Sequence, residues 1–142
     1  MADDWRGHQI GDIVFTDSIE VSREMVVRYA GASGDFNPIH YRDDFAKSVG
    51  LDGVLAHGML TMGLAISALS EWLGDAALIM AYQVRFTKPL YIPLEGSAKV
   101  SVSVSLSDVR KNESVAASLA LNVTREDGAK LLGKSFLEVA NR

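Results

Sequence analysis

Residues 57–70 read "HGMLTMGLAISALS" and carry no acidic or basic side chain after the histidine. If this segment is helical, its apolar residues lie all around the helix: Met59, Leu60, Met62, Leu64, Ile66 and Leu69. Such a helix is either wrapped by the rest of a globular fold or crosses a membrane. Because Asp52 and Glu71 flank it closely, it falls short of the roughly 20 apolar residues that a bilayer span needs. We predict a buried central helix, no membrane span, and core packing for Met59 and Met62.

After residue 80 the pattern changes from helical to alternating. In residues 99–106, valines and a leucine alternate with a lysine and serines, and residues 115–123 repeat the alternation. A period of two is typical of half-buried strands. Two further strands are expected at 82–86 and around 131–139, with turns at 88–96, 110–114 and 125–128. Long strands joined by short turns predict an antiparallel meander with one solvated face.

The N-terminal half adds a strand over residues 13–21 and a second helix. Ser22 is a suitable N-cap for a helix that begins at Arg23, and Gly31 and Gly34 are suited to end it. The predicted order is strand, helix, loop, buried helix and four antiparallel strands, without a repeat or a long linker. We therefore predict one α+β domain over residues 1–142, a curved sheet around a central helix.

Composition excludes several classes of function. The chain has 142 residues, a formal net charge of −4 and no basic run, so no nucleic-acid partner is expected. It has no cysteine, which excludes disulfides and thiolate metal sites. Its three histidines lack metal-ligand spacing and no glycine-rich phosphate loop follows a strand, so neither a metal nor a nucleotide cofactor is predicted. The first ten residues lack the apolar core of a secretory signal, which leaves the cytoplasm as the expected location.

Residues 34–40, "GDFNPIH", hold the candidate chemistry. Asp35 and His40 can act as an acid/base pair, provided that the loop brings them together. Pro38 breaks regular structure and pushes Asn37 towards an extended conformation, so the chain can turn back between the two groups. The Asn37 amide is expected to tie the loop or to orient a catalytic side chain, and Phe36 and Ile39 are expected to anchor the loop in apolar surroundings. Taken alone, an aspartate and a histidine at this spacing are usually a solvated loop.

Two longer segments favour a site over a solvated loop. Residues 29–60, "YAGASGDFNPIHYRDDFAKSVGLDGVLAHGML", and residues 84–90, "VRFTKPL", resemble the MaoC-like family of R-specific enoyl hydratases and dehydratases. The resemblance implies the hotdog fold, a long antiparallel sheet wrapped around one apolar helix. It also implies that Asp35 and His40 are catalytic, and it places an oxyanion contact at Gly58. Within the family, residues 50–63 are most similar to the actinobacterial-type catalytic B subunit of (3R)-hydroxyacyl-acyl carrier protein dehydratase.

The resemblance implies reversible, R-specific hydration and dehydration of 2-enoyl and (3R)-hydroxyacyl thioesters. The substrate is then an acyl-CoA or an acyl-acyl carrier protein, and the expected partner is a second copy or a related hotdog subunit. A hotdog thioesterase and a non-catalytic acyl-binding subunit are the alternatives. Some family members place a serine further along the central helix, where this chain has Ile66, and the neighbouring Ser67 is assigned no role.

The start of the central helix is the second part of the predicted site. A free backbone N–H at a helix N-terminus can stabilise negative charge on a thioester oxygen. Gly58 lies at this start, and the lack of a side chain would let a substrate approach its N–H. For His57, helix capping and substrate contact both stay open. Which of Asp35 and His40 is the base also stays open.

Overall fold

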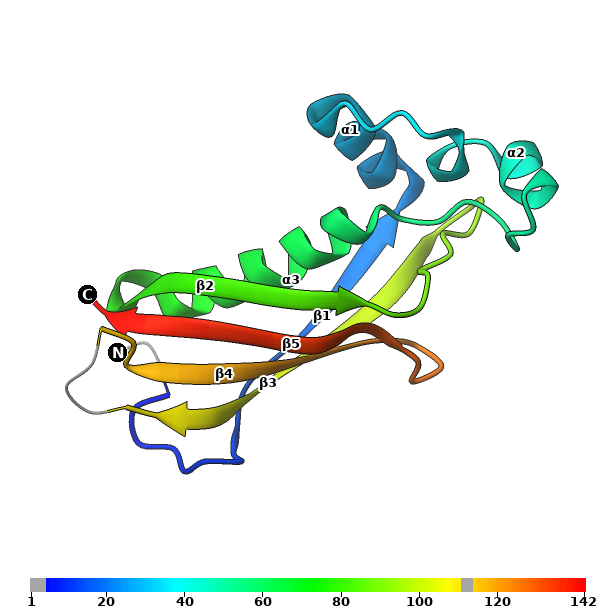
Figure 1. Ribbon diagram of the computed structural model, residues 1–142. Coiled ribbons are helices and arrows are strands. Elements are labelled where there is room, and N and C mark those ends of the chain that lie inside the picture. The colour runs from blue at the N-terminus through cyan, green and yellow to red at the C-terminus, as the bar shows by residue number, and fades with distance from the viewer. Residues whose placement is uncertain (1–4, 111–113) are drawn as a thin grey trace.

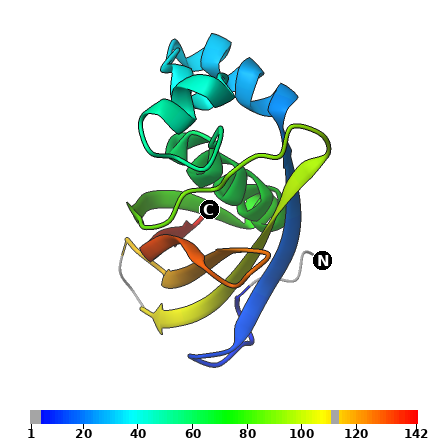
Figure 2. The same cartoon turned by 90° about the vertical axis from the view of Figure 1, so that its right-hand side faces the viewer.

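The computed structural model describes residues 5–110 and 114–142, in which one long helix lies across a five-stranded antiparallel sheet (Figure 1). The strands are β1 (Ile13–Ser22), β2 (Ala77–Phe86), β3 (Ser97–Val109), β4 (Ala117–Arg125) and β5 (Lys130–Asn141). The helices are α1 (Arg23–Ser33), α2 (Asp43–Ser48) and α3 (Gly58–Leu73), with short 3₁₀ helices at Pro38–His40 and Gly74–Ala76. The sheet curves around α3, as a view turned by 90° shows (Figure 2). The predicted α+β class is confirmed.

The sheet is not a simple meander, because its strand order is β1-β3-β4-β5-β2. The segment 87–96 is therefore a connection across the sheet and not a hairpin turn between β2 and β3. Alternation predicts which residues of a strand face the core, but it does not specify the neighbouring strand. The meander holds for β3, β4 and β5. The turn expected at 110–114 falls mostly on residues 111–113, which lie outside the described residues.

Helix α3 buries one face against the sheet. Its buried residues recur every four positions: Thr61, Ala65, Leu69 and Leu73. Met59 is 56% exposed and Met62 is partly buried, so the prediction that both pack in the core is wrong for Met59. Apolar residues around the whole helix therefore do not mean that it is enclosed on all sides. No helix among residues 5–110 and 114–142 is long and apolar enough to cross a membrane.

Helices α1 and α2 lie beyond the end of the sheet at which α3 begins (Figure 1). Helix α1 starts as predicted, with the Ser22 hydroxyl accepting a hydrogen bond from the Met25 N–H at 3.3 Å. Gly34 ends it in the left-handed conformation, at φ 75°, which glycine adopts without strain. The helix therefore runs past Gly31. The segment that follows connects α1 to α2 near the start of α3 (Figure 1).

Candidate active site

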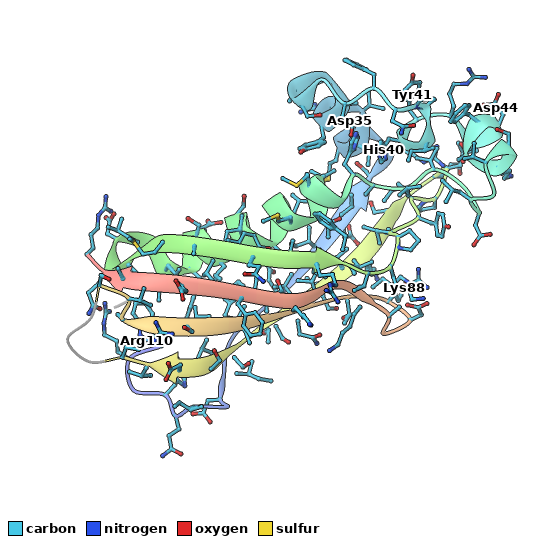
Figure 3. The ribbon with its side chains drawn as sticks, in the orientation of Figure 1. Asp35, His40, Tyr41, Asp44, Lys88 and Arg110 are labelled. Atoms are coloured by element: carbon cyan, nitrogen blue, oxygen red, sulfur yellow. The ribbon has the colours of Figure 1, made fainter. Side chains whose placement is uncertain are left out.

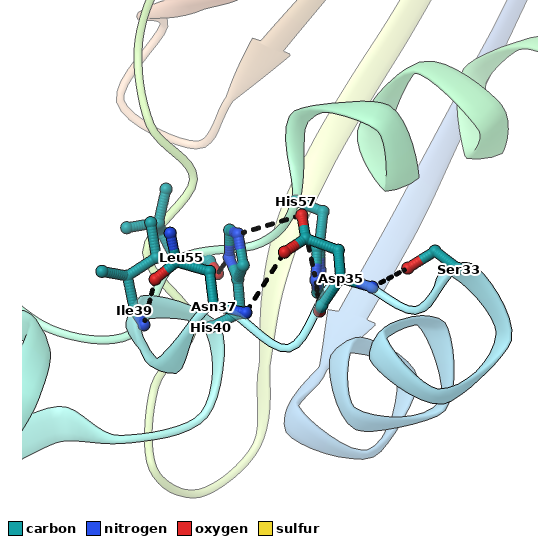
Figure 4. A network of polar contacts seen from close by, with 7 residues as sticks. All are labelled: Ser33, Asp35, Asn37, Ile39, His40, Leu55 and His57. Carbon is teal, nitrogen blue, oxygen red and sulfur yellow. Dashed lines mark hydrogen bonds and ion pairs between the residues drawn. The ribbon is translucent and has the colours of Figure 1, made fainter.

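The loop after α1 folds back on itself because of its asparagine and proline (Figure 4). Asn37 adopts φ −57° and ψ 122°, and its side-chain oxygen accepts a hydrogen bond from the Ile39 N–H at 3.2 Å. Pro38 occupies the first turn of the 3₁₀ helix that follows, where its fixed φ is favourable. Asp35 Oδ1 accepts a hydrogen bond from the Asn37 N–H at 3.2 Å. This contact restrains the carboxylate and leaves Oδ2 free to face the histidines.

His40 ends the 3₁₀ helix with its ring buried and its orientation fixed. Its Nδ1 lies 2.7 Å from the Leu55 carbonyl oxygen, and because a carbonyl only accepts, Nδ1 carries the proton. The neutral ring therefore presents a lone pair at Nε2, which is 3.9 Å from Asp35 Oδ2. The Asp35 side chain is 53% exposed and that of His40 is 8% exposed, so the carboxylate reaches solvent while the imidazole is enclosed. Both lie at the end of the molecule that carries α1 and α2 (Figure 3).

His57 packs against one face of the His40 ring, and its Nε2 lies 4.0 Å from the same Asp35 Oδ2. The two imidazoles are stacked, with centroids 3.7 Å apart and planes at 22°. His57 Nε2–H donates to the Asp35 backbone carbonyl at 3.1 Å, and the ring of Tyr29 packs edge-on against it at 4.8 Å. The side chain makes no capping hydrogen bond to α3 and is only 2% exposed, so the capping interpretation is wrong. The ring instead holds the backbone of Asp35 and one face of His40.

The three side chains lie close enough to suggest a metal site, since one ligand atom from each falls within 4.8 Å of the others. A metal ion must lie near the plane of every imidazole that binds it, along the nitrogen lone pair. The stacked planes of His40 and His57 are nearly parallel and do not converge on one point. In addition, His57 Nε2 already donates to a carbonyl. The arrangement is therefore better suited to proton transfer than to binding a metal.

Burial lowers the pKa of His40 below its ordinary value of 6.5. The hydrogen bond to the Leu55 carbonyl opposes this shift, the neighbouring His57 adds to it, and the Asp35 carboxylate opposes it. The result is a neutral imidazole at pH 7. The 3.9 Å approach of Asp35 is then a contact between a carboxylate and a neutral ring, and not an ion pair.

Gly58 is the first residue of α3 and lines a cavity of about 360 Å³. Its N–H and that of Met59 have no hydrogen-bond partner among the described residues, as expected for the first turn of a helix. A Cβ at Gly58 would lie 2.8 Å from the Phe86 ring. A side chain at this position would therefore displace the Phe86 ring, which is a second reason for a glycine besides the approach of a substrate. Apolar residues form most of the remaining lining, and Lys88 also lines it.

The structure adds residues that the sequence did not single out. Leu55 contributes only its carbonyl, so no pattern of side chains could indicate it. Tyr29 and Phe86 belong to the segments that carry the family resemblance, but their contacts with His57 and Gly58 depend on the fold. Phe36 is 61% exposed beside Asp35, so the expectation that it anchors the loop in apolar surroundings is wrong.

Comparison with known proteins gives matches along most of the chain. Residues 8–124 match the family model described as the MaoC-like domain. The chain is 30% identical to 3-hydroxybutyryl-CoA dehydratase of Methylorubrum extorquens over 124 residues, which are 87% of this chain and 76% of that protein. It is 36% identical over 75 residues to 3-hydroxyacyl-thioester dehydratase X of Mycobacterium tuberculosis. That match covers 53% of this chain but only 26% of the longer relative.

Solved structures show the same fold. The (R)-hydratase of Aeromonas caviae involved in PHA biosynthesis superposes with a TM-score of 0.83 over 96% of this chain and 99% of that chain, at 22% identity. The ChsH1–ChsH2 complex of Mycobacterium tuberculosis superposes with a TM-score of 0.78 over 95% of this chain and 99% of the matched chain, at 20% identity. The sheet and central helix described above are thus the hotdog arrangement of these proteins.

Proposed function

The chain belongs to the MaoC-like domain family, and from this premise we propose that it is a hydro-lyase acting on 2-enoyl and (3R)-hydroxyacyl thioesters. The observation that carries the proposal is the 3.9 Å approach of Asp35 Oδ2 to the unprotonated Nε2 of His40. This gap is too long for a direct hydrogen bond. It leaves room for one water that hydrogen-bonds to both atoms.

In the hydration direction, His40 Nε2 takes a proton from this water as its oxygen bonds to C3 of the enoyl thioester. The C2–C3 π electrons move towards the thioester carbonyl and give an enolate. The imidazolium then returns its proton to C2, which restores the neutral ring. One base serves both steps, so the hydroxyl and the proton reach the same face of the double bond. Asp35 orients the water and stabilises the imidazolium, and dehydration follows the same steps in reverse.

The enolate oxygen needs a hydrogen-bond donor, and the free N–H of Gly58 at the start of α3 supplies one. The helix dipole adds positive potential at the same place. The apolar cavity beside Gly58 can take part of the acyl chain or of the pantetheine arm, and Lys88 in its lining can meet a phosphate of the carrier. This chemistry requires neither a metal nor an organic cofactor.

A second hotdog subunit is the proposed partner. β2 is an edge strand of ten residues, and Leu78 and Met80 on it are 44% and 55% exposed. Such an edge pairs readily with another strand. Either a second copy or a related chain fits this edge, and ChsH1 of Mycobacterium tuberculosis forms a complex with ChsH2. Sedimentation of the purified chain distinguishes a homodimer from a chain that needs a different partner.

The proposal is tested by following the ultraviolet band of the conjugated enoyl thioester with crotonyl-CoA and a longer 2-enoyl-CoA. A hydratase removes the band without releasing free thiol, whereas a thioesterase releases thiol. A non-catalytic subunit changes neither signal. Since the chain spans only part of some relatives, a chain inactive alone is retested with a second hotdog subunit. Inactivity in that mixture too contradicts the proposal.

The pH dependence of hydration follows from the lowered pKa of His40. Because the base must be neutral, kcat/KM is expected to be level around pH 7–8 and to fall as the pH drops through a value below 6.5. The fall tracks protonation of the free enzyme. An acid limb centred above 6.5 contradicts the assignment of His40 as the base. The measurement is a pH profile of kcat/KM for crotonyl-CoA in buffers of constant ionic strength.

Replacing His57 tests whether it acts as a positioning residue. His57→Phe keeps a ring against His40 but removes the Nε2–H that holds the Asp35 carbonyl. We expect kcat to fall about 10- to 100-fold, because a displacement near 1 Å at the reacting groups can cost about 100-fold. KM is expected to stay within about twofold, since the ring is buried. An unchanged kcat would show that the hydrogen bond does not position Asp35.

A further inference from the structure

Arg23 and Asp43 join the two ends of the segment that carries Asp35 and His40. Arg23 is the first residue of α1 and Asp43 the first of α2. Arg23 Nη1 donates to Asp43 Oδ2 and Nη2 to Oδ1, both at 2.8 Å. Two parallel charge-assisted hydrogen bonds of this kind fix both position and orientation. These hydrogen bonds therefore hold together the two ends of the segment that carries Asp35 and His40.

The same pair is tied to the backbone that leads to α3. Arg23 Nε and Nη2 donate to the Ile92 carbonyl at 3.1 and 2.9 Å. Asp43 Oδ1 accepts from the Val54 N–H at 3.4 Å, and the Ile92 N–H donates to the Val54 carbonyl at 2.9 Å. Val54 and Ile92 are thus hydrogen-bonded to each other and to the pair of side chains at the starts of α1 and α2.

The residue after Val54 makes the contact that matters for proton transfer. The Leu55 N–H donates to the Ile39 carbonyl at 3.2 Å, and the Leu55 carbonyl accepts from His40 Nδ1–H at 2.7 Å. Hydrogen bonds and the backbone of residues 54 and 55 therefore connect the Arg23 guanidinium to the imidazole of His40. Its last contact determines which nitrogen of His40 holds the proton.

A second pair of an arginine and an aspartate lies next to this one in the sequence but makes no such hydrogen bonds to residues 54 and 92 among the described residues. Arg42 and Asp44 form an ion pair at the surface, with side chains 56% and 70% exposed. The Arg23 and Asp43 side chains are 21% and 41% exposed. Asp44 lies on α2, away from Asp35 and His40 (Figure 3). An exposed pair contributes little to stability, so Arg42 and Asp44 make a matched control.

We propose that Arg23 and Asp43 are positioning residues that hold the Leu55 carbonyl against His40 and so keep the imidazole in its Nδ1–H form. Neither residue is proposed to touch the substrate. The inference rests on the proposed function only for its effect on turnover. The effect on His40 itself can be measured whether or not the chain is a hydratase.

The test uses Arg23→Gln, Asp43→Asn, the double variant, and Arg42→Gln and Asp44→Asn as controls. Arg23→Lys is added because it keeps the charge but loses the two parallel donors. Nitrogen-15 spectra of the ring nitrogens report the tautomer of His40, and with three histidines in the chain the signals can be assigned by substitution. Hydration of crotonyl-CoA gives kcat and KM, and thermal unfolding identifies variants that do not fold.

In the folded Arg23 and Asp43 variants we expect His40 to become a mixture of tautomers and kcat to fall about 10- to 100-fold, with KM within about twofold. The double variant should lose no more than either single variant, because the two residues act as one unit. The controls should keep the Nδ1–H form and at least half of wild-type kcat. If wild type is inactive, the tautomer alone decides.

Three results overturn the inference. The first is an unchanged His40 tautomer in folded Asp43→Asn or Arg23→Lys. The second is a double variant whose loss equals the product of the two single losses, which would mean independent roles. The third is an equal change in the Arg42 and Asp44 variants. Failure of the proposed function gives a different result. Wild type then does not hydrate the enoyl thioester, but the Arg23 and Asp43 variants still differ from wild type in the tautomer of His40.

Discussion

Asp35→Asn is expected to lower kcat/KM for hydration of crotonyl-CoA by about 10²–10⁴-fold, and His40→Ala by a similar factor. The amide of the first variant cannot stabilise an imidazolium, although it keeps the size of the side chain. The second variant removes the imidazole that is proposed to act as the base. Asp35 is 53% exposed and its side chain packs in no core, so Asp35→Asn should fold with wild-type thermal stability.

The Asp35/His40 double variant should be hardly slower than either single variant, because residues that act as a unit are not additive. Asp44→Asn, a nearby carboxylate with 70% side-chain exposure, should keep wild-type kcat/KM and serves as the control. The assay follows loss of the enoyl band and free thiol together. Turnover that survives both single substitutions would show that residues 34–40 form a structural turn and that the mechanism proposed for them is wrong.

The sequence predicted the elements of the fold better than their arrangement. Alternation in residues 99–106 identified β3, where Val100, Val102, Val104 and Leu106 are all buried. The pairing of β2 with β5 could not be predicted, because β3 and β4 lie between these two strands in the sequence. The pairing depends on the curvature of the whole sheet. Met59 was assigned to the core for a related reason. An apolar residue near the end of a helix is buried only if something packs beyond it.

The candidate site shows the same division. Asp35, Asn37, Pro38 and His40 lie in one short loop, so local turn chemistry already suggested that the acidic and basic groups could meet. The stacking of His57 on His40 joins residues from two elements, and the Leu55 carbonyl that orients His40 has no side-chain signal. Contacts of this kind, between residues of different elements or with a backbone carbonyl, can be identified only from the folded structure. The proposal that His40 is the base depends on the proton on Nδ1, which the contact with the Leu55 carbonyl places.

Gly58→Pro is expected to lower kcat by about 10²–10³-fold, the loss typical of removing one oxyanion donor. Proline lacks the N–H, and its fixed φ suits the first position of a helix. The preceding residue, His57, has φ −57° and ψ 132°, which a residue before proline adopts readily. The obstacle is Phe86, whose ring lies 2.8 Å from the Cβ that any substitution would introduce. The variant is therefore made together with Phe86→Ala, which opens this space.

The comparison that isolates the N–H is Gly58→Pro against Gly58→Ala, both in the Phe86→Ala background. Both place a Cβ beside the cavity and both meet the same opened space, but only alanine keeps the donor. If Gly58 stabilises the enolate oxygen, the proline variant loses kcat relative to the alanine variant while both unfold at similar temperatures. If the two have equal kcat, the glycine is there to accommodate Phe86, and another donor must stabilise the developing charge. Because wild-type Phe86 is 52% exposed and can turn away, Gly58→Ala alone cannot separate these two reasons for the glycine.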